Sequence, residues 1–286
     1  MPTNDSDPSP GTVPPDVSPA GAASPEALLA VGPTAGRQSP PARIWTLTLA
    51  AGLIAGFASW LVGETLQGRF QPGLLVTNGI PSPEESKAHS MVMAAAVMLE
   101  ATLAFASLGA ALGLALGVAG GTAGRSARAA SIAGVSGAIL GAVAGAAMTQ
   151  LLLPIYFRSY DPDNEDLILG LLIKGGISSA IGAAGGAALA FGIGLGDRGR
   201  AVRAILGGLL GAIAGVLVYE LIGILAFPLD ETTKPISATW GTRLLARLAV
   251  TIFASVGATL GANSAPRDGA GRHERRPDPQ GRGNPS

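Results

Sequence analysis

The chain has 286 residues, of which 48% are hydrophobic and only 13% are charged, and it contains 42 glycines. Soluble domains usually carry about 25% charged residues, so this composition excludes an ordinary soluble domain and indicates a protein in lipid. The formal net charge of zero argues against a nucleic-acid partner, and the lack of cysteine excludes disulfides and thiolate metal sites.

The two ends of the chain differ in composition from the region between them. Residues 1–41 are rich in Pro, Ser, Ala and Gly, and they lack the basic start and short apolar core of a cleaved signal peptide. Residues 264–286 are similarly polar. Neither segment holds enough apolar side chains to build a core, so we expect both to be disordered tails.

Six long apolar runs fill the region between the tails. Each is near or above the ~20 residues that a helix needs to cross a bilayer, and none alternates as a strand would. The runs cover residues 44–63, 91–119, 129–153, 167–195, 204–227 and 239–262. We therefore predict an all-α integral membrane protein with six transmembrane helices in one membrane domain, 42–263.

Basic residues are distributed unevenly over the gaps between these runs. Four lie on one side of the predicted membrane, namely Arg69, Lys87, Arg158 and Lys234. Twelve lie on the other side, namely Arg37, Arg43, Arg125, Arg128, Arg198, Arg200, Arg203, Arg267, Arg272, Arg275, Arg276 and Arg282. The positive-inside rule therefore predicts that both tails are cytoplasmic, and we expect the protein in the cell inner (plasma) membrane.

Short glycine-rich words recur in all six predicted helices. The odd-numbered helices contain GLIAG at 52–56, GAVAG at 141–145 and GAIAG at 211–215. The even-numbered helices contain GAALG at 109–113, GAAGG at 182–186 and GATLG at 257–261. We interpret the repeated unit as a helical hairpin that occurs three times as parallel repeats, at about 43–120, 128–196 and 203–263.

Glycines at four-residue spacing lie on one face of a helix and let backbones approach closely in lipid. We predict that these glycines pack the helices together. They are Gly52, Gly56, Gly109, Gly113, Gly137, Gly141, Gly145, Gly182, Gly186, Gly207, Gly211, Gly215, Gly257 and Gly261.

Charged residues occur within the predicted spans, where each costs roughly 2.5–3.5 kcal/mol on insertion scales. Counting back from the even-helix words places Glu100, Lys174 and Arg247 at about the same depth. Three more charges lie near the outer helix ends, namely Glu64, Glu220 and Arg243. We predict one cluster in which three carboxylates and three cations lower the cost of burying one another.

Two functions are compatible with such a cluster. The leading hypothesis is a transporter or permease-like protein that binds a small polar solute at the charges. The alternative is a non-transporting structural or interaction protein, whose charges are packing ion pairs and which forms homo-oligomers through glycine faces. In both cases the lipid bilayer is a partner.

The word GVSG at 134–137 resembles the nucleophile motif of rhomboid intramembrane proteases, and that resemblance implies a serine activated by a membrane-embedded histidine. The two histidines, His89 and His273, lie at an outer helix edge and in the tail. We therefore expect the Ser136 hydroxyl to bond back to its own helix, and we expect no enzyme activity. The acidic segment 161–166 lacks the glycine of an EF-hand loop, and we expect no metal and no cofactor.

Overall fold

The computed structural model describes residues 41–70, 82–124, 126–159, 167–194, 196–226 and 239–264. All regular elements in these residues are α-helices, and all six are long and apolar enough to cross a membrane. They are α2 (Pro41–Leu66), α3 (Pro83–Ala123), α4 (Ala127–Ser159), α5 (Leu167–Ile193), α6 (Arg198–Ala226) and α7 (Trp240–Asn263). The predicted tails lie outside the described residues except for Pro41 and Ser264.

The start of α3 differs most from the prediction, because the helix begins at Pro83 instead of near residue 91. Ser82 caps it: the Ser82 side chain accepts the Glu85 N–H at 3.2 Å, and the Glu85 carboxylate accepts the Ser82 N–H at 2.8 Å. This reciprocal pair is a capping box, which satisfies two backbone donors that would otherwise lack partners. The cap extends the helix by two turns of mainly polar residues.

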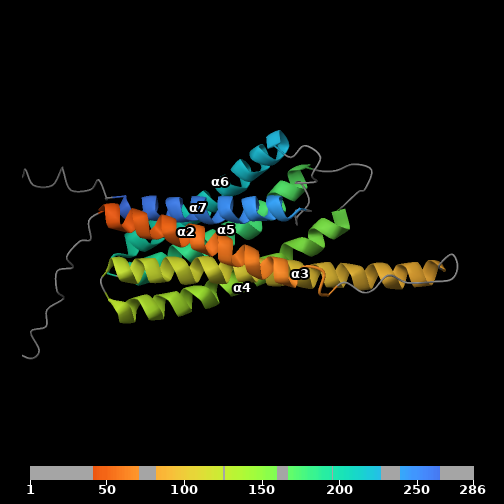
Figure 1. Cartoon of the computed structure of the whole chain (residues 1–286), viewed down its shortest axis with the longest axis horizontal. Coiled ribbons are helices and arrows are strands. Elements are labelled where there is room, and N and C mark those ends of the chain that lie inside the picture. Colours follow the sequence, from red (N-terminus) through yellow and green to blue (C-terminus); the bar gives the residue numbers. More distant parts are fainter. Residues whose placement is uncertain are drawn as a thin grey trace, which may run out of the picture. The chain divides into compact units, whose positions relative to one another are not determined.

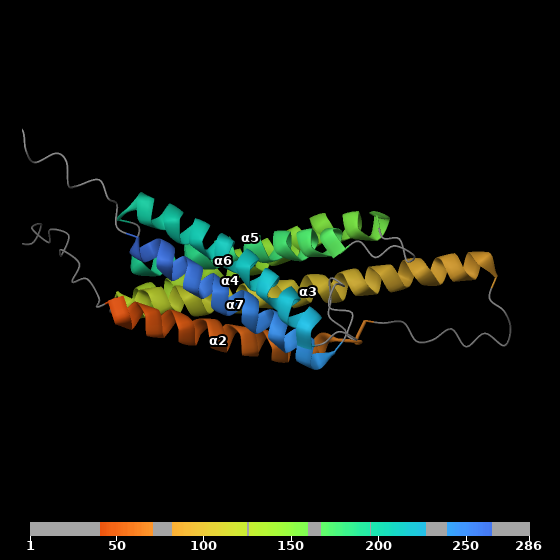
Figure 2. The ribbon, with the colours of Figure 1, turned by 90° about the horizontal axis from the view of Figure 1, so that it is seen from above.

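With 41 residues, α3 is the longest helix. At 1.5 Å per residue it measures about 60 Å, roughly twice the ~30 Å hydrocarbon core of a bilayer. Its N-terminal end extends past the ends of the other helices (Figures 1 and 2).

The helices form a bundle with three inner and three outer members. Within the described residues, α3, α5 and α7 contact one another in the middle of the bundle, although α3 and α7 meet over only a few residues. Each outer helix fills the groove between two inner ones: α4 lies between α3 and α5, α6 between α5 and α7, and α2 between α7 and α3. The start of α2 and the end of α7 lie at the same end of the bundle (Figure 1).

Apolar side chains occupy both the core and the exterior of the bundle. Leu112, Leu116 and Ile181 are fully buried where the inner helices meet. On the outside, Leu225 is 75% exposed and Ile168 is 68% exposed. A helix that is apolar on every face is typical of a membrane span, because exposure of its outer apolar side chains to water would be unfavourable.

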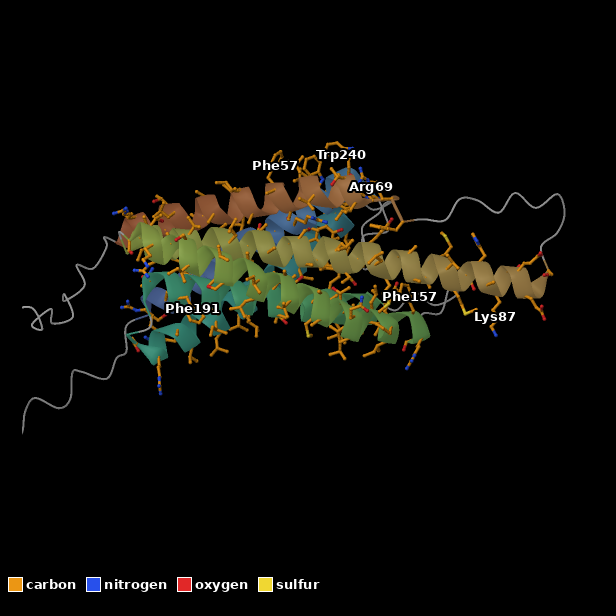
Figure 3. The ribbon with its side chains drawn as sticks, turned by 90° about the horizontal axis from the view of Figure 1, so that it is seen from below. Phe57, Arg69, Lys87, Phe157, Phe191 and Trp240 are labelled. Atoms are coloured by element: carbon orange, nitrogen blue, oxygen red, sulfur yellow. The ribbon has the colours of Figure 1, made fainter. Side chains whose placement is uncertain are left out.

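The described ends of the bundle carry different side chains. Arg43 at the start of α2 donates from Nη2 to the Thr122 carbonyl of α3 at 3.1 Å. Phe191 lies near this end, whereas Trp240 and Arg69 lie toward the opposite end and Lys87 on the projecting part of α3 (Figure 3). The described arginines at the Phe191 end are Arg43, Arg128, Arg198, Arg200 and Arg203.

Glycines bring helix backbones into direct contact. At each of the fourteen glycines predicted to pack helices, an added β-carbon would overlap an atom of a neighbouring helix. At the α3–α4 junction Gly109 meets the Gly141 carbonyl, and at the α5–α6 junction Gly182 meets the Gly208 carbonyl. At the α7–α2 junction, Gly52 meets the Ser255 hydroxyl.

In the third predicted hairpin, the glycine-rich motifs are not the residues that make the equivalent helix contacts. Gly257 and Gly261 face α6, whereas Ser255 and Thr259 face α2, and Thr259 Oγ1 donates to Thr48 Oγ1 at 2.8 Å. In α6, Gly208 and not Gly211 faces the preceding helix. The glycine motifs at 211–215 and 257–261 therefore contact a different neighbouring helix than the corresponding motifs of the other two predicted hairpins. This difference is possible because α6 and α7 carry small residues on more than one face.

Candidate functional site

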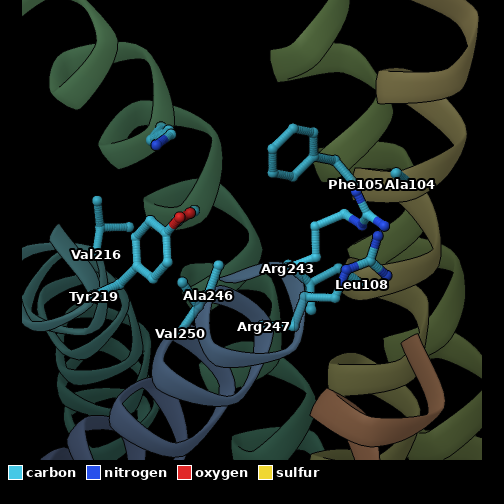
Figure 4. Close-up of a pocket in the computed structure, with 11 residues that line it drawn as sticks. Ala104, Phe105, Leu108, Val216, Tyr219, Arg243, Ala246, Arg247 and Val250 are labelled. Carbon is cyan, nitrogen blue, oxygen red and sulfur yellow. The ribbon is translucent and has the colours of Figure 1, made fainter. Parts of the chain in front are cut away.

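A cavity of about 80 Å³ lies among α3, α5, α6 and α7. One buried water needs roughly 10–15 Å³ of such space, so the cavity has room for several waters or a small solute. In Figure 4, Arg243 and Arg247 extend from α7 toward α3, and Tyr219 of α6 lies across the cavity from them. The lining residues are Ala104, Phe105, Leu108, Lys174, Ser178, Val216, Tyr219, Arg243, Ala246, Arg247 and Val250.

Lys174 of α5 forms an ion pair with Glu220 of α6. The distance from Lys174 Nζ to Glu220 Oε1 is 2.8 Å, and the two side chains are only 8% and 14% exposed. The same Nζ lies 5.1 Å from the centroid of the Tyr219 ring, which adds a cation–π contact. The Lys174 ammonium is thus held between a carboxylate and an aromatic face.

Arg243 of α7 forms a second ion pair, with Glu64 of α2. Its Nε donates to Glu64 Oε1 at 2.7 Å, and its Nη2 donates to Glu64 Oε2 at 2.9 Å. Such bidentate pairs are the strongest geometry for a guanidinium and a carboxylate. This pair joins two helices that are far apart in the sequence.

Arg247 lies one turn further along α7, and its guanidinium has a backbone partner instead of a carboxylate partner. Its Nη1 donates to the Ser59 carbonyl, and its guanidinium packs against Gly63 so closely that a β-carbon there would overlap it. Among the described residues, no carboxylate lies within 4 Å of this guanidinium. Three cations therefore line the cavity, and among the described residues Glu220 and Glu64 form ion pairs with two of them.

Glu100 is not part of this cluster. Its side chain is buried, its Oε1 accepts the Phe70 N–H at 3.4 Å, and it does not line the cavity. The structure therefore brings together Glu64, Lys174, Glu220, Arg243 and Arg247, and it leaves Glu100 one turn beyond the cavity-lining residue Ala104.

The contact points explain why Glu100 is displaced. The three junction residues Gly109, Gly182 and Ser255 are spaced by 73 residues in both steps. Eight residues before each of them stand Ala101, Lys174 and Arg247. Counted from the glycine-rich motifs instead, Glu100, Lys174 and Arg247 precede Gly109, Gly182 and Gly257 by nine, eight and ten residues, and this near-match placed Glu100 at the α3 position.

The facing helices show the same correspondence. Their contact residues at the three junctions are Gly141, Gly208 and Gly52, and twelve residues after each stand Leu153, Glu220 and Glu64. Where two junctions carry a cation and a carboxylate, the α3–α4 junction carries Ala101 and Leu153, which are 0% and 1% exposed. The residues just before these three are Leu152, Tyr219 and Gly63, and both Tyr219 and Gly63 contact the cation of their junction.

Other predicted sites have simple partners. Ser136 Oγ donates to the Ala133 carbonyl at 3.3 Å, as expected for a hydroxyl that bonds back to its helix. Among the described residues, no group of three His, Asp or Glu could hold a metal ion, and the acidic segment 161–166 lies outside those residues.

Comparison with known proteins found no matching family model, no matching curated protein and no matching solved structure. The candidate function therefore depends on the bundle, its cavity and the charges in the cavity wall.

Proposed function

We propose that this chain is a multi-pass protein of the cell inner membrane that binds a small polar solute in the cavity and moves it across the membrane, as transporters and permeases do. The observation that carries this proposal is the cavity itself. Three cations line it inside a bundle of helices that are each long and apolar enough to cross a bilayer. Charged side chains within a membrane are costly, face the bundle interior or a cavity, and mark the pathways of solutes and ions in transporters.

The outer surface supports membrane insertion. Large apolar side chains such as Ile54, Leu172 and Leu210 are more than 60% exposed. The five described arginines near one end of the bundle support a cytoplasmic location for that end, and with it for both tails.

We also propose that the domain consists of three related hairpins. The inner contact residues are equally spaced along the chain, and each outer helix fills an equivalent groove. Parallel repeats of this kind place a solute site where the repeats meet, near the centre of the bundle.

The two ion pairs favour a second candidate function. If Lys174–Glu220 and Arg243–Glu64 serve only to join helices, the chain is a non-transporting structural or interaction membrane protein. The fourteen predicted packing glycines already contact helices of the same chain, so homo-oligomers of such a protein would use other faces of the bundle. In that case the cavity is a packing defect among α3, α5, α6 and α7.

Solute flux separates the two functions. The full chain is reconstituted in liposomes, and uptake of small anionic, neutral and cationic solutes is compared with uptake into empty liposomes. Arg247→Gln is the test variant, and Arg158→Gln, at an exposed position outside the cavity, is the matched control. Uptake that Arg247→Gln abolishes and Arg158→Gln preserves supports transport, and uptake equal to that of empty liposomes for every solute rejects it.

A further inference from the structure

We infer that the end of α4 and the start of α5 form a lid over the cavity, and that this lid swings on Pro154 and on Gly175-Gly176. The lid consists of residues 155–159 and 167–174. This inference rests on the proposed function, because it describes how a solute enters the same cavity. Three observations carry it: the two hinge points, their common level in the bundle, and the ion pair that closes the lid.

The hinge in α4 is Pro154, which lies inside the helix. Proline has no N–H, so the Gln150 carbonyl loses the donor that the fourth following residue of a helix supplies. Sharp bends in helices occur mostly at such prolines. Beyond Pro154, the last turns of α4 lie apart from α3, and Ile155 and Phe157 are exposed (Figures 1 and 2). The end of α4 can therefore change direction while the rest of the helix stays in place.

The hinge in α5 is the pair Gly175-Gly176, which directly follows Lys174. An added β-carbon at Gly176 would overlap the Leu152 side chain of α4, so close packing accounts for this glycine. At Gly175, no described atom of a neighbouring helix lies within 4 Å of such a β-carbon, so packing does not require a glycine there. Two adjacent glycines inside a helix make it easier for the backbone to leave helical geometry.

The two hinges lie at the same level of the bundle. Leu152, which packs against Gly176, stands two residues before Pro154. Hinges at one level let the ends of both helices move together, since a few such residues can absorb the change in backbone angles. The other two predicted hairpins have neither proline nor glycine at the corresponding positions, which are Thr65, Thr102, Leu221 and Leu248.

The Lys174–Glu220 ion pair closes the lid. Lys174 is the last lid residue of α5, and its Nζ lies 2.8 Å from Oε1 of Glu220 in α6, which is outside the lid. Lys174 also lines the cavity, together with Ser178 of α5 and Tyr219 of α6 (Figure 4). A swing of the lid away from α6 therefore separates the ion pair and uncovers the cavity in one movement.

A thiol in the cavity measures opening of the lid independently of transport. Ser178 lines the cavity and is 3% exposed, and the chain has no cysteine, so Ser178→Cys introduces one buried thiol. In detergent, mass spectrometry of the full chain follows the modification of this thiol by iodoacetamide. Glu220→Gln removes the ion pair and should raise the rate of modification about tenfold or more. Gly175→Ala stiffens the hinge and should lower that rate about fourfold.

Two controls separate opening of the lid from other effects. Ser255→Cys introduces a thiol at a fully buried position of α7, and Glu220→Gln should leave its rate of modification unchanged. Gly241→Ala adds a β-carbon that also meets no described neighbouring atom, outside the lid, and should leave the Ser178→Cys rate unchanged. The inference is overturned by equal Ser178→Cys rates with and without Glu220→Gln and Gly175→Ala. A rise of equal size at both thiols in Glu220→Gln also overturns it, because the whole bundle then opens.

The liposome assay distinguishes failure of this inference from failure of the proposed function. Arg247-dependent uptake of a solute, with labelling that neither Glu220→Gln nor Gly175→Ala changes, rejects the lid while the transport function stands. Labelling that responds as expected, without uptake of any solute, supports the lid and rejects transport.

Discussion

The α3–α4 and α5–α6 junctions share their backbone contacts but differ in chemistry at one level of the bundle. Both bring glycine against glycine, Gly109 on Gly141 and Gly182 on Gly208. At the corresponding level beyond these contacts, α5–α6 carries Lys174 and Glu220, whereas α3–α4 carries Ala101 and Leu153. Close backbone packing is therefore common to both junctions, whereas the buried charges occur at only one of them.

The largest expected effect comes from breaking the charged pair. Glu220→Gln leaves the Lys174 ammonium in a mostly apolar wall without its carboxylate, and removal of one partner of a buried pair costs about 3–5 kcal/mol. The double variant Lys174→Ala, Glu220→Leu reproduces the α3–α4 chemistry and should regain most of that loss. Unfolding in detergent measures both, and a double variant as unstable as Glu220→Gln would contradict the comparison.

The reverse exchange adds charge to the apolar junction. Ala101→Lys buries a cation without a partner and should destabilise by about 2.5–3.5 kcal/mol. Adding Leu153→Glu supplies a carboxylate across the junction and should recover part of the loss. The coupling free energy from the double-mutant cycle is the measurement, and zero coupling would show that the two positions are not equivalent to Lys174 and Glu220.

The backbone contacts that the junctions share should be sensitive to a single methyl group. Gly109→Ala forces the Gly141 carbonyl away and should cost about 1–3 kcal/mol. Gly175→Ala is the matched control, because no described atom of a neighbouring helix lies within 4 Å of the new β-carbon. The control should be neutral or slightly stabilising, since alanine favours the helix. Equal losses in the two variants would argue against tight contact at Gly109.

The smallest expected effect distinguishes the α7–α2 junction, where α7 presents hydroxyls instead of glycines to Gly52 and Gly56 of α2. Thr48→Val removes the bond from Thr259 Oγ1, and interhelical bonds of this kind average about 0.6 kcal/mol. Thr46→Val, at an exposed position whose hydroxyl bonds only within its own helix, is the control and should leave stability unchanged. A loss of several kcal/mol for Thr48→Val would mean that this junction depends on hydroxyls instead of close packing.

Most of the fold follows from the apolar runs, because a continuous run of bilayer length has few alternatives to a helix. The start of α3 was missed, since Glu84, Glu85 and Lys87 end the apolar run. A signal was present in Ser82-Pro83-Glu84-Glu85, which has the spacing of a capping box and a proline at the first helical position.

The site was predicted less completely. The charges themselves stand out in apolar runs, so Lys174, Glu220, Arg243, Glu64 and Arg247 could be selected. The pairing of these charges could not be predicted, because it depends on how each helix is rotated about its own axis. Glycines lie on several faces of the helices, so they do not indicate that rotation. Glu100 was placed in the cluster because its distance from the α3 motif nearly equals those of Lys174 and Arg247 from theirs. Tyr219 and Gly63 were missed, although each immediately precedes a glutamate of an ion pair.

The long α3 also makes the orientation of the chain measurable. Its first turns, around Ser86 and Lys87, are exposed and project past the other helices. The chain has no cysteine, so Ser86→Cys would introduce the single thiol of the molecule. If this part of α3 stands outside the cell membrane, an impermeant maleimide will label that thiol on intact cells, and the rest of the topology follows from one reaction.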